Sequence, residues 1–207
     1  EANWNFHKAR RLSNLGFSIG GEWSSKKYLK SDFDYSKLEY HMNWRQRTFP
    51  LARIDAKLSA GYVFGEALPH KFFSIESSSS FISGNTAMRG TDEKEFYGSK
   101  FVSLSLEHNW GEIIPGLIRI PNIAEFGLEF VNFVNLSYSG FDSNDIFAHY
   151  DGKLFIPNST AATIDKWYYE IGLGVNRLLI FFRTDITIRL SQVEHPRFFL
   201  KFTSANF

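Results

Sequence analysis

Apolar and polar side chains alternate along residues 53–65. One set of alternate positions is apolar: Ile54, Ala56, Leu58, Ala60, Tyr62 and Phe64. The opposite face carries Arg53, Asp55, Lys57, Ser59 and Gly61. Because successive side chains of a strand point to opposite sides, this pattern predicts a strand with one apolar and one polar face. Its length exceeds the roughly 5–6 residues of an ordinary strand and suits the about 9–11 residues that a tilted strand needs to cross a bilayer.

The same alternation recurs along the chain and predicts eight strands. They cover residues 14–23, 35–45, 53–65, 100–108, 126–138, 166–175, 182–190 and 197–207, and in the fifth of them Asn132 interrupts the apolar face. Repeated long strands of this kind are typical of transmembrane β-barrels, whose strands alternate between lipid-facing and lumen-facing side chains. We therefore predict an all-β fold, a transmembrane antiparallel β-barrel, with residues 1–207 as one barrel domain.

The connections between the predicted strands alternate in length. Residues 46–52 and 176–181 are short, whereas 66–99 and 140–165 are long and polar. Bacterial barrels keep short periplasmic turns and long extracellular loops, so we expect the two long loops outside the cell and the carboxyl terminus in the periplasm. Residues 111–124 depart from this trend because they are fairly long and apolar. They fit either a turn that dips into the interfacial layer or a docking surface for a partner protein.

The composition fits a barrel without requiring one. Aromatic residues make up 17% of the chain, which suits lipid-facing walls and interfacial girdles, although the core of a large β-sandwich would use the same residues. No window approaches 18 consecutive apolar residues, which excludes a transmembrane helix. Residues 1–4 lack both the basic start and the apolar core of a signal peptide, so we expect the sequence to begin inside a longer protein or after processing.

Charge and residue usage exclude several functions. The chain has no cysteine and a net charge of +1, which argues against disulfides, thiolate metal sites and nucleic-acid binding. The histidines show no metal-ligand spacing; they are His7, His41, His70, His108, His149 and His195. We expect no cofactor. His41 lies near Glu39, Asp55 and Lys57 on the predicted lumen wall, which leaves a lumenal hydrolase as a minor alternative. No Ser–His–carboxylate motif is recognisable, so we expect no enzyme.

The size of the complete barrel depends on where residues 66–99 lie. The interior of an eight-strand barrel is just filled by its own side chains, so it has no room for a long segment that folds inward. Small residues on the polar face would also leave such a barrel underpacked: Gly16, Ser18, Gly20, Ser59, Gly61, Ser103, Ser105, Gly172 and Gly174. These features favour the carboxyl-terminal half of a wider barrel. If the loop stays outside, a closed eight-strand barrel remains the alternative.

A motif in this loop matches a known family. Gly84-Asn85-Thr86-Ala87-Met88-Arg89-Gly90-Thr91 is followed by Phe96-Tyr97-Gly98 and by a strand that ends with Ser103-Leu104-Ser105-Leu106-Glu107. The arrangement resembles the sixth loop and twelfth strand of the BamA/TamA superfamily, also called the bacterial surface antigen family. In that family a hydrophobic-Arg-Gly-aromatic motif enters the barrel lumen. Met88, Arg89 and Gly90 match it, whereas Thr91 stands where the family prefers an aromatic residue.

The resemblance covers essentially the whole chain. Residues 130–137 are similar to the family's thirteenth strand, with Asn135 at the position of its Asp and Ser137 at that of its Gly. Residues 168–174 and 181–185 resemble a branch in which a carboxypeptidase-regulatory-like domain precedes the barrel, and the chain ends on an aromatic residue, Phe207. The resemblance implies strands nine to sixteen of a sixteen-strand barrel in the outer membrane of a Gram-negative bacterium.

The charge of Arg89 predicts a specific partner. A guanidinium carried into a barrel lumen stays charged, and it needs a fixed acceptor because an unpaired buried charge costs several kcal/mol. Glu107 has lumen-facing parity on the strand that follows the loop, so we expect it to hold Arg89. By the resemblance Asn135 is a second acceptor, but it lacks the charge of the family's Asp, which predicts a weaker lock. The alternative is an Arg-Gly dipeptide exposed in a flexible loop.

Two classes of function follow from these expectations. The first is a machine that inserts or exports proteins at the outer membrane, as the resemblance implies. The second is a passive channel or surface-binding barrel. We expect outer-membrane lipid and lipopolysaccharide around the barrel, and client or accessory envelope proteins as further partners in the first class.

Overall fold

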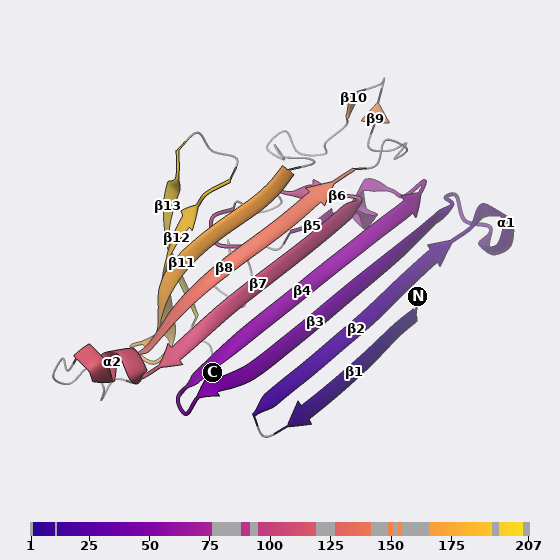
Figure 1. The fold of residues 1–207 in the computed structure, drawn as a ribbon. Helices are drawn as coiled ribbons and strands as arrows, with labels where there is room; N and C mark the ends of the chain where they lie inside the picture. The colour runs from indigo at the N-terminus through magenta and orange to yellow at the C-terminus, as the bar shows by residue number, and fades with distance from the viewer. Residues whose placement is uncertain are drawn as a thin grey trace.

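The computed structural model describes residues 2–10, 12–75, 88–91, 95–118, 127–141, 149–150, 153–154, 166–191 and 195–204. The described chain is mostly antiparallel β-structure, dominated by one nine-stranded sheet in the order β1-β2-β3-β4-β7-β8-β11-β12-β13 (Figure 1). These strands are β1 (Ala2–Arg10), β2 (Ser13–Ser24), β3 (Tyr35–Phe49), β4 (Ala52–Gly65), β7 (Lys100–Gly111), β8 (Glu129–Gly140), β11 (Lys166–Leu178), β12 (Phe182–Arg189) and β13 (Arg197–Ser204).

The predicted count of eight strands was one too few. Ala2–Arg10 forms β1, which pairs with β2 along its whole length. Trp4 and Phe6 alternate with polar residues in β1, and their ring centroids lie 5.4 and 4.9 Å from that of Phe17 on β2. β1 contributes only these two large apolar side chains, so its alternation is weaker than that of its neighbours.

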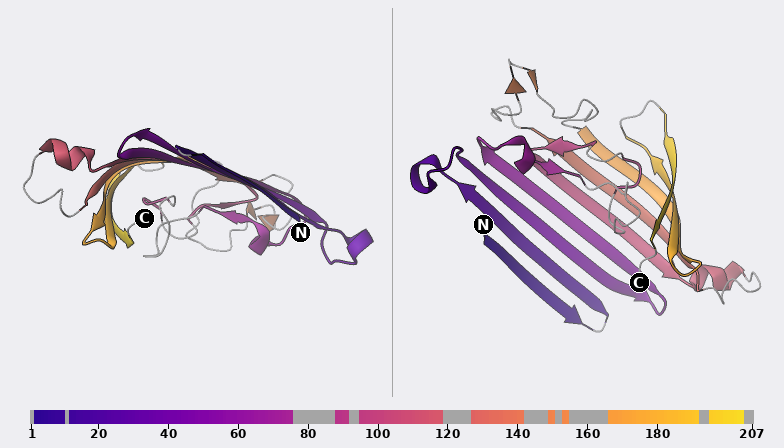
Figure 2. Two further views of the ribbon diagram at one scale, coloured as in Figure 1. Left: turned by 90° about the horizontal axis from the view of Figure 1, so that it is seen from below. Right: turned by 180° about the vertical axis from the view of Figure 1, so that it is seen from behind.

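The sheet is curved and open. It runs nearly flat through β1–β4 and curls over at β11–β13 (Figure 2). Within the described residues β1 pairs only with β2, and β13 pairs only with β12. The alternative of a closed eight-strand barrel is therefore not what these residues form.

The two faces of the sheet differ in chemistry, in agreement with the alternating sequence. Large apolar side chains are exposed on the convex face, among them Leu38, Phe64, Leu106, Val134, Ile171, Leu173, Ile186 and Leu200. Polar side chains from the same strands point to the concave face, and several are buried there, among them Ser105, Glu107, Asn135, Glu170 and Asp185. Within the described residues, no helix has the length and apolar character needed to span a membrane.

Part of the segment between β4 and β7 lies over the concave face (Figure 2). It contains the 3-10 turn η1 (Pro69–Lys71) and two short paired strands, β5 (Phe73–Ser74) and β6 (Tyr97–Gly98). A Cβ atom on Gly61 would lie 2.4 Å from the ring of Phe73 and 2.6 Å from that of Phe101. The lack of a side chain at Gly61 therefore leaves no gap, because the rings of Phe73 and Phe101 occupy that space.

Short and long connections lie at opposite ends of the sheet (Figure 1). Residues 50–51 and 179–181 are tight turns at one end, where the helix α2 (Ile113–Ile118) also lies. The helix α1 (Lys26–Leu29), the short strands β5 and β6, and the paired strands β9 (His149–Tyr150) and β10 (Lys153–Leu154) lie at the other end. Ser204 pairs with Phe182, so β13 ends on the side of the tight turns.

Candidate functional site

The Met88-Arg89-Gly90 motif is buried against the concave face of the sheet. Met88 is 1% exposed and Arg89 is 2% exposed. Their surroundings come from β7, β8, β11 and β12, which present polar side chains inward at alternate positions. The Arg-Gly dipeptide is therefore not an exposed loop tip.

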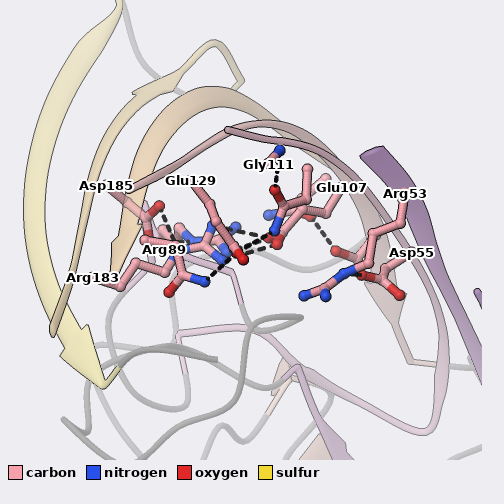
Figure 3. Close-up of polar contacts among 12 residues, drawn as sticks. Arg53, Asp55, Arg89, Glu107, Gly111, Glu129, Arg183 and Asp185 are labelled. Carbon is pink, nitrogen blue, oxygen red and sulfur yellow. Dashed lines mark hydrogen bonds and ion pairs between the residues drawn. The ribbon is translucent and has the colours of Figure 1, made fainter. Parts of the chain in front are cut away.

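Arg89 joins a cluster of four charged side chains (Figure 3). Its Nη2 donates to Glu107 Oε2 at 3.1 Å, and its Nε donates to Asp185 Oδ2 at 2.9 Å. Arg183 binds the same two carboxylates, with two hydrogen bonds of 2.9 Å to Glu107 and one of 2.9 Å to Asp185 Oδ1. Two guanidinium groups thus share two carboxylates, and no side chain of the four is more than 3% exposed.

This cluster holds the predicted pair, but Glu107 does not act alone. Buried ions are tolerated when each has an opposite charge and hydrogen bonds to match its remaining atoms. Glu107 is committed to Arg183 through both oxygens, and Arg89 adds a further bond to one of them. Arg183 and Glu107 therefore form a pair between two strands of the sheet, β12 and β7, and Arg89 is the group that the loop adds to it.

The ring of Phe133 forms the floor beneath Arg89. The guanidinium carbon lies 3.8 Å from the ring centroid, within the range of a cation–π contact. Phe133 is the cross-strand neighbour of Gly172, and a Cβ atom on Gly172 would lie 2.2 Å from the Phe133 ring. Gly172 is thus a glycine because the ring that supports Arg89 fills its place, rather than a sign of an underpacked wall.

Glu170 binds the backbone of the motif. Its Oε1 accepts a hydrogen bond from the Arg89 N–H at 2.8 Å, and its Oε2 accepts one from the Gly90 N–H at 2.6 Å. The hydroxyl of Tyr168 also donates to Oε2. A Cβ atom on Gly90 would lie 2.8 Å from the Tyr168 oxygen and 2.9 Å from Glu170 Oε2. Only glycine brings the backbone this close to the carboxylate.

Asn135 acts through Glu170. Ser105, Asn135 and Glu170 lie side by side on β7, β8 and β11. The Ser105 hydroxyl donates to Asn135 Oδ1 at 2.6 Å, and Asn135 Nδ2 donates to Glu170 Oε1 at 2.6 Å. The role of Asn135 as a second acceptor for Arg89 stays a prediction, and the contacts that the structure does give it are with Ser105 and Glu170. Its amide donates to a carboxylate, which an aspartate could not do when ionised.

Thr91 stands where the motif that the loop resembles has an aromatic residue, and Phe96 lies nearby in the structure. Thr91 is buried, and its hydroxyl donates to the carbonyl of Met88 at 3.5 Å, across a turn of the loop. Aromatic packing around the motif comes instead from Phe96 and Tyr168, whose ring centroids are 5.1 Å apart. Together with Ile75 and Met88 these rings form a small apolar cluster between loop and wall.

A second ionic contact fixes the segment that follows the motif. Glu95 accepts hydrogen bonds from Arg189 Nη1 at 3.1 Å and Nη2 at 2.7 Å, and Arg189 Nη1 also donates to the carbonyl of Gly90 at 3.2 Å. The loop thus carries a cation, Arg89, onto wall carboxylates and an anion, Glu95, onto a wall guanidinium. Because the two contacts have opposite charge on the loop side, exchanging Arg89 and Glu95 would bring like charges together, so the contacts favour one orientation of the loop.

The start of the same segment is tied to β2. Lys71 Nζ donates to Glu22 Oε1 at 2.5 Å, and it lies 5.8 Å from the ring centroid of Tyr35. The hydrogen bond to Glu22 raises the pKa of Lys71 above its ordinary value. The segment between β4 and β7 is therefore held by strands on both sides of it in the sheet.

The other candidate site, around His41, is much more open. His41 Nδ1 lies 3.0 Å from the Ser59 hydroxyl, and its Nε2 is 3.9 Å from Glu39 Oε2. The His41 side chain is 40% exposed, and Asp55 pairs with Arg45 and Arg53 instead. The contact to Glu39 is too long for a hydrogen bond that would orient the imidazole for catalysis. The described residues contain no group of three side chains placed to hold a metal ion.

Sequence reasoning missed Glu170, Arg183, Asp185 and Arg189 as members of the site. Each alternates with apolar residues in its strand and so has the parity of the polar, concave face, which was the available signal. Parity does not say which charged residues meet, because that depends on strand register and on where the loop lies.

A comparison with protein-family models and with curated proteins finds no match to this chain. The resemblance to the BamA/TamA superfamily thus depends on the motif and strand residues alone.

Proposed function

We propose that this chain is the carboxyl-terminal part of a bacterial outer-membrane β-barrel of the BamA/TamA type, which inserts or exports proteins at that membrane. In this proposal the convex face meets lipid, residues 66–99 are the sixth loop, and the tight turns face the periplasm. With β1 included, the chain supplies strands eight to sixteen of a sixteen-strand barrel.

The observation that carries the proposal is the burial of Arg89 in the wall cluster. Loop and wall are complementary in charge at two points, Arg89 with Glu107 and Asp185, and Glu95 with Arg189. A surface loop of a soluble sheet has no need for such a costly ionic contact, because burying charges contributes little net stability. Its value is specificity, since it holds one long loop in one pose inside the wall.

The convex face supports the membrane part of the proposal. Large apolar side chains are exposed on it from β3 to β13, among them Leu38, Leu106, Leu173 and Leu200, whereas soluble monomers rarely expose extended apolar surfaces. In a membrane the two edge strands, β1 and β13, would need further strands beside them, because unpaired backbone N–H and C=O groups cannot face hydrocarbon.

The test of the architecture is heat-modifiable migration in detergent. The protein with its upstream sequence should give a compact, protease-resistant form that unfolds on heating, whereas residues 1–207 expressed alone should not. A stable compact monomer formed by residues 1–207 alone would overturn the half-barrel.

A passive channel is the second candidate, and one observation favours it. The concave wall of β2–β4 remains polar and open beside the loop, with a hollow of about 380 Å³ lined by Asn14, Asn43, Arg45 and Lys57 among others. Reconstitution of the full protein separates the two functions. An insertase should accelerate folding of an added barrel protein into vesicles with little conductance, whereas a channel should conduct ions and leave that folding rate unchanged.

A further inference from the structure

A groove of about 580 Å³ lies on the convex face where α2 meets the sheet. Its lining includes Ile114 from α2, Phe130 from β8, Leu173 from β11 and Ile186 from β12. Leu173 and Ile186 are 67% and 54% exposed, so the protein itself leaves the groove uncovered within its described residues. The volume lies within the 300–1,000 Å³ of typical ligand sites.

None of the described residues that line the groove carries a charge, and two of its polar groups bind each other. The indole of Trp110 donates to Asn132 Oδ1 at 2.7 Å. The carbonyl oxygen of Asn132, the residue that interrupts the apolar face of β8, is thereby paired, and most of the other residues that line the groove are apolar. A ligand in this groove thus gains by burying hydrocarbon and meets no unpaired charge.

We propose that this groove binds one acyl chain of a phospholipid. The proposal rests on the membrane-spanning barrel proposed above, because only there does the convex face meet lipid. The groove lies at the end of the tight turns, so in that topology it opens to the periplasmic leaflet and takes phospholipid rather than lipopolysaccharide. The described part of the connection between β7 and β8, which includes α2, then enters the interfacial layer.

The surroundings of the groove favour a lipid over a protein partner. Protein interfaces have a polar rim that carries hydrogen bonds. Here the neighbouring exposed side chains are apolar, as at Ile171 and Leu200. Trp110 lies between the apolar convex face and the tight turns, which is the level of the membrane–water interface where tryptophan is enriched.

The test is lipid retention by the full protein, purified from membranes and released from detergent in native mass spectrometry. The wild type should retain one phospholipid. Ile186→Trp should lower the retained fraction about tenfold, a loss of about 1.4 kcal/mol, by filling the groove. Leu200→Trp is the matched control, because Leu200 is the cross-strand neighbour of Ile186 on the same face and does not line the groove. It should retain lipid as the wild type does.

A second variant, Ile114→Trp, fills the groove from α2 and leaves the sheet untouched, so it serves if Ile186→Trp does not fold. The proposal is overturned by a wild type that retains no lipid, by equal retention in the filled variants, or by a co-purifying protein that takes the place of lipid. Alkaline extraction of membranes tests the membrane barrel separately from the lipid-binding groove. Extraction of the protein into the soluble fraction would refute the membrane barrel itself, whereas a resistant protein without bound lipid refutes only the groove.

Discussion

Asn135 donates a hydrogen bond of 2.6 Å to Oε1 of Glu170, the same oxygen that accepts the backbone N–H of Arg89. The asparagine therefore positions the acceptor that holds the loop. The family resemblance places an aspartate here, and in this chain that residue would set two carboxylates against each other. Asn135 and Glu170 are each 0% exposed, so water cannot relieve the repulsion.

Asn135→Asp should therefore lower the stability of the protein rather than strengthen the contact between the loop and the sheet. We expect a loss of about 3 kcal/mol at neutral pH, because a donor is lost and a buried like charge is added. The measurement is the urea midpoint of the full protein in detergent. Unchanged or raised stability in Asn135→Asp would contradict the assigned role.

Arg89 and Glu107 should be coupled energetically. Arg89→Ala and Glu107→Gln should each cost about 3–5 kcal/mol, because each leaves an opposite charge unmatched in a buried site. Glu107→Gln should be the more damaging, since Arg183 also depends on Glu107. The double mutant should lose less than the sum.

The control for this pair is Arg45→Ala. Arg45 pairs with Asp55 on the same wall, but its side chain is 53% exposed, and such pairs are worth below about 1 kcal/mol. Additive losses in the Arg89–Glu107 cycle would remove the case for a loop fixed by this pair.

Gly90→Ala tests the close approach of the loop to Glu170. The new methyl group would lie 2.8 Å from the Tyr168 oxygen, so we expect a loss of about 1–3 kcal/mol and faster protease cleavage in residues 76–94. Gly116→Ala is the matched control, because a Cβ there meets nothing within 4 Å. It should leave stability unchanged or slightly raised, as alanine favours helix. Equal effects of the two changes would show that Gly90 is not packed as described.

A charge exchange tests the orientation of the loop. Glu95→Arg and Arg189→Glu should each destabilise the protein by placing like charges together. The double exchange should recover part of the loss, but not all, because Arg189 also donates to the carbonyl of Gly90. Limited proteolysis of the loop is the measurement. No recovery in the double exchange would indicate that Glu95 and Arg189 meet only incidentally.

The topology is open to labelling on intact cells. Single cysteines at Tyr28, in α1, and at Leu51, in a tight turn, are well exposed positions at opposite ends of the sheet. An impermeant maleimide should label Tyr28→Cys and spare Leu51→Cys. The reverse pattern would mean that the barrel is inverted in the membrane.

The two-residue period of the sequence determined most of the sheet. Strands β3 and β4 were predicted to within a few residues, because their large apolar side chains recur at every second position. β1 was missed because a run with only two large apolar residues gives little periodic signal. Parity also placed Glu107 on the buried polar face, since its strand neighbours on the other face are apolar.

Tertiary structure decided what the polar face does. Register sets Asn135 beside Glu170, and the return of the loop sets Arg89 between Glu107 and Asp185, residues 18 and 96 positions away. A periodic pattern records only which side of a strand each residue occupies, and it is the same for any register that differs by two. The sequence by itself thus determined which residues point inward. Only the folded chain, through strand pairing and the path of one loop, determined which of them meet.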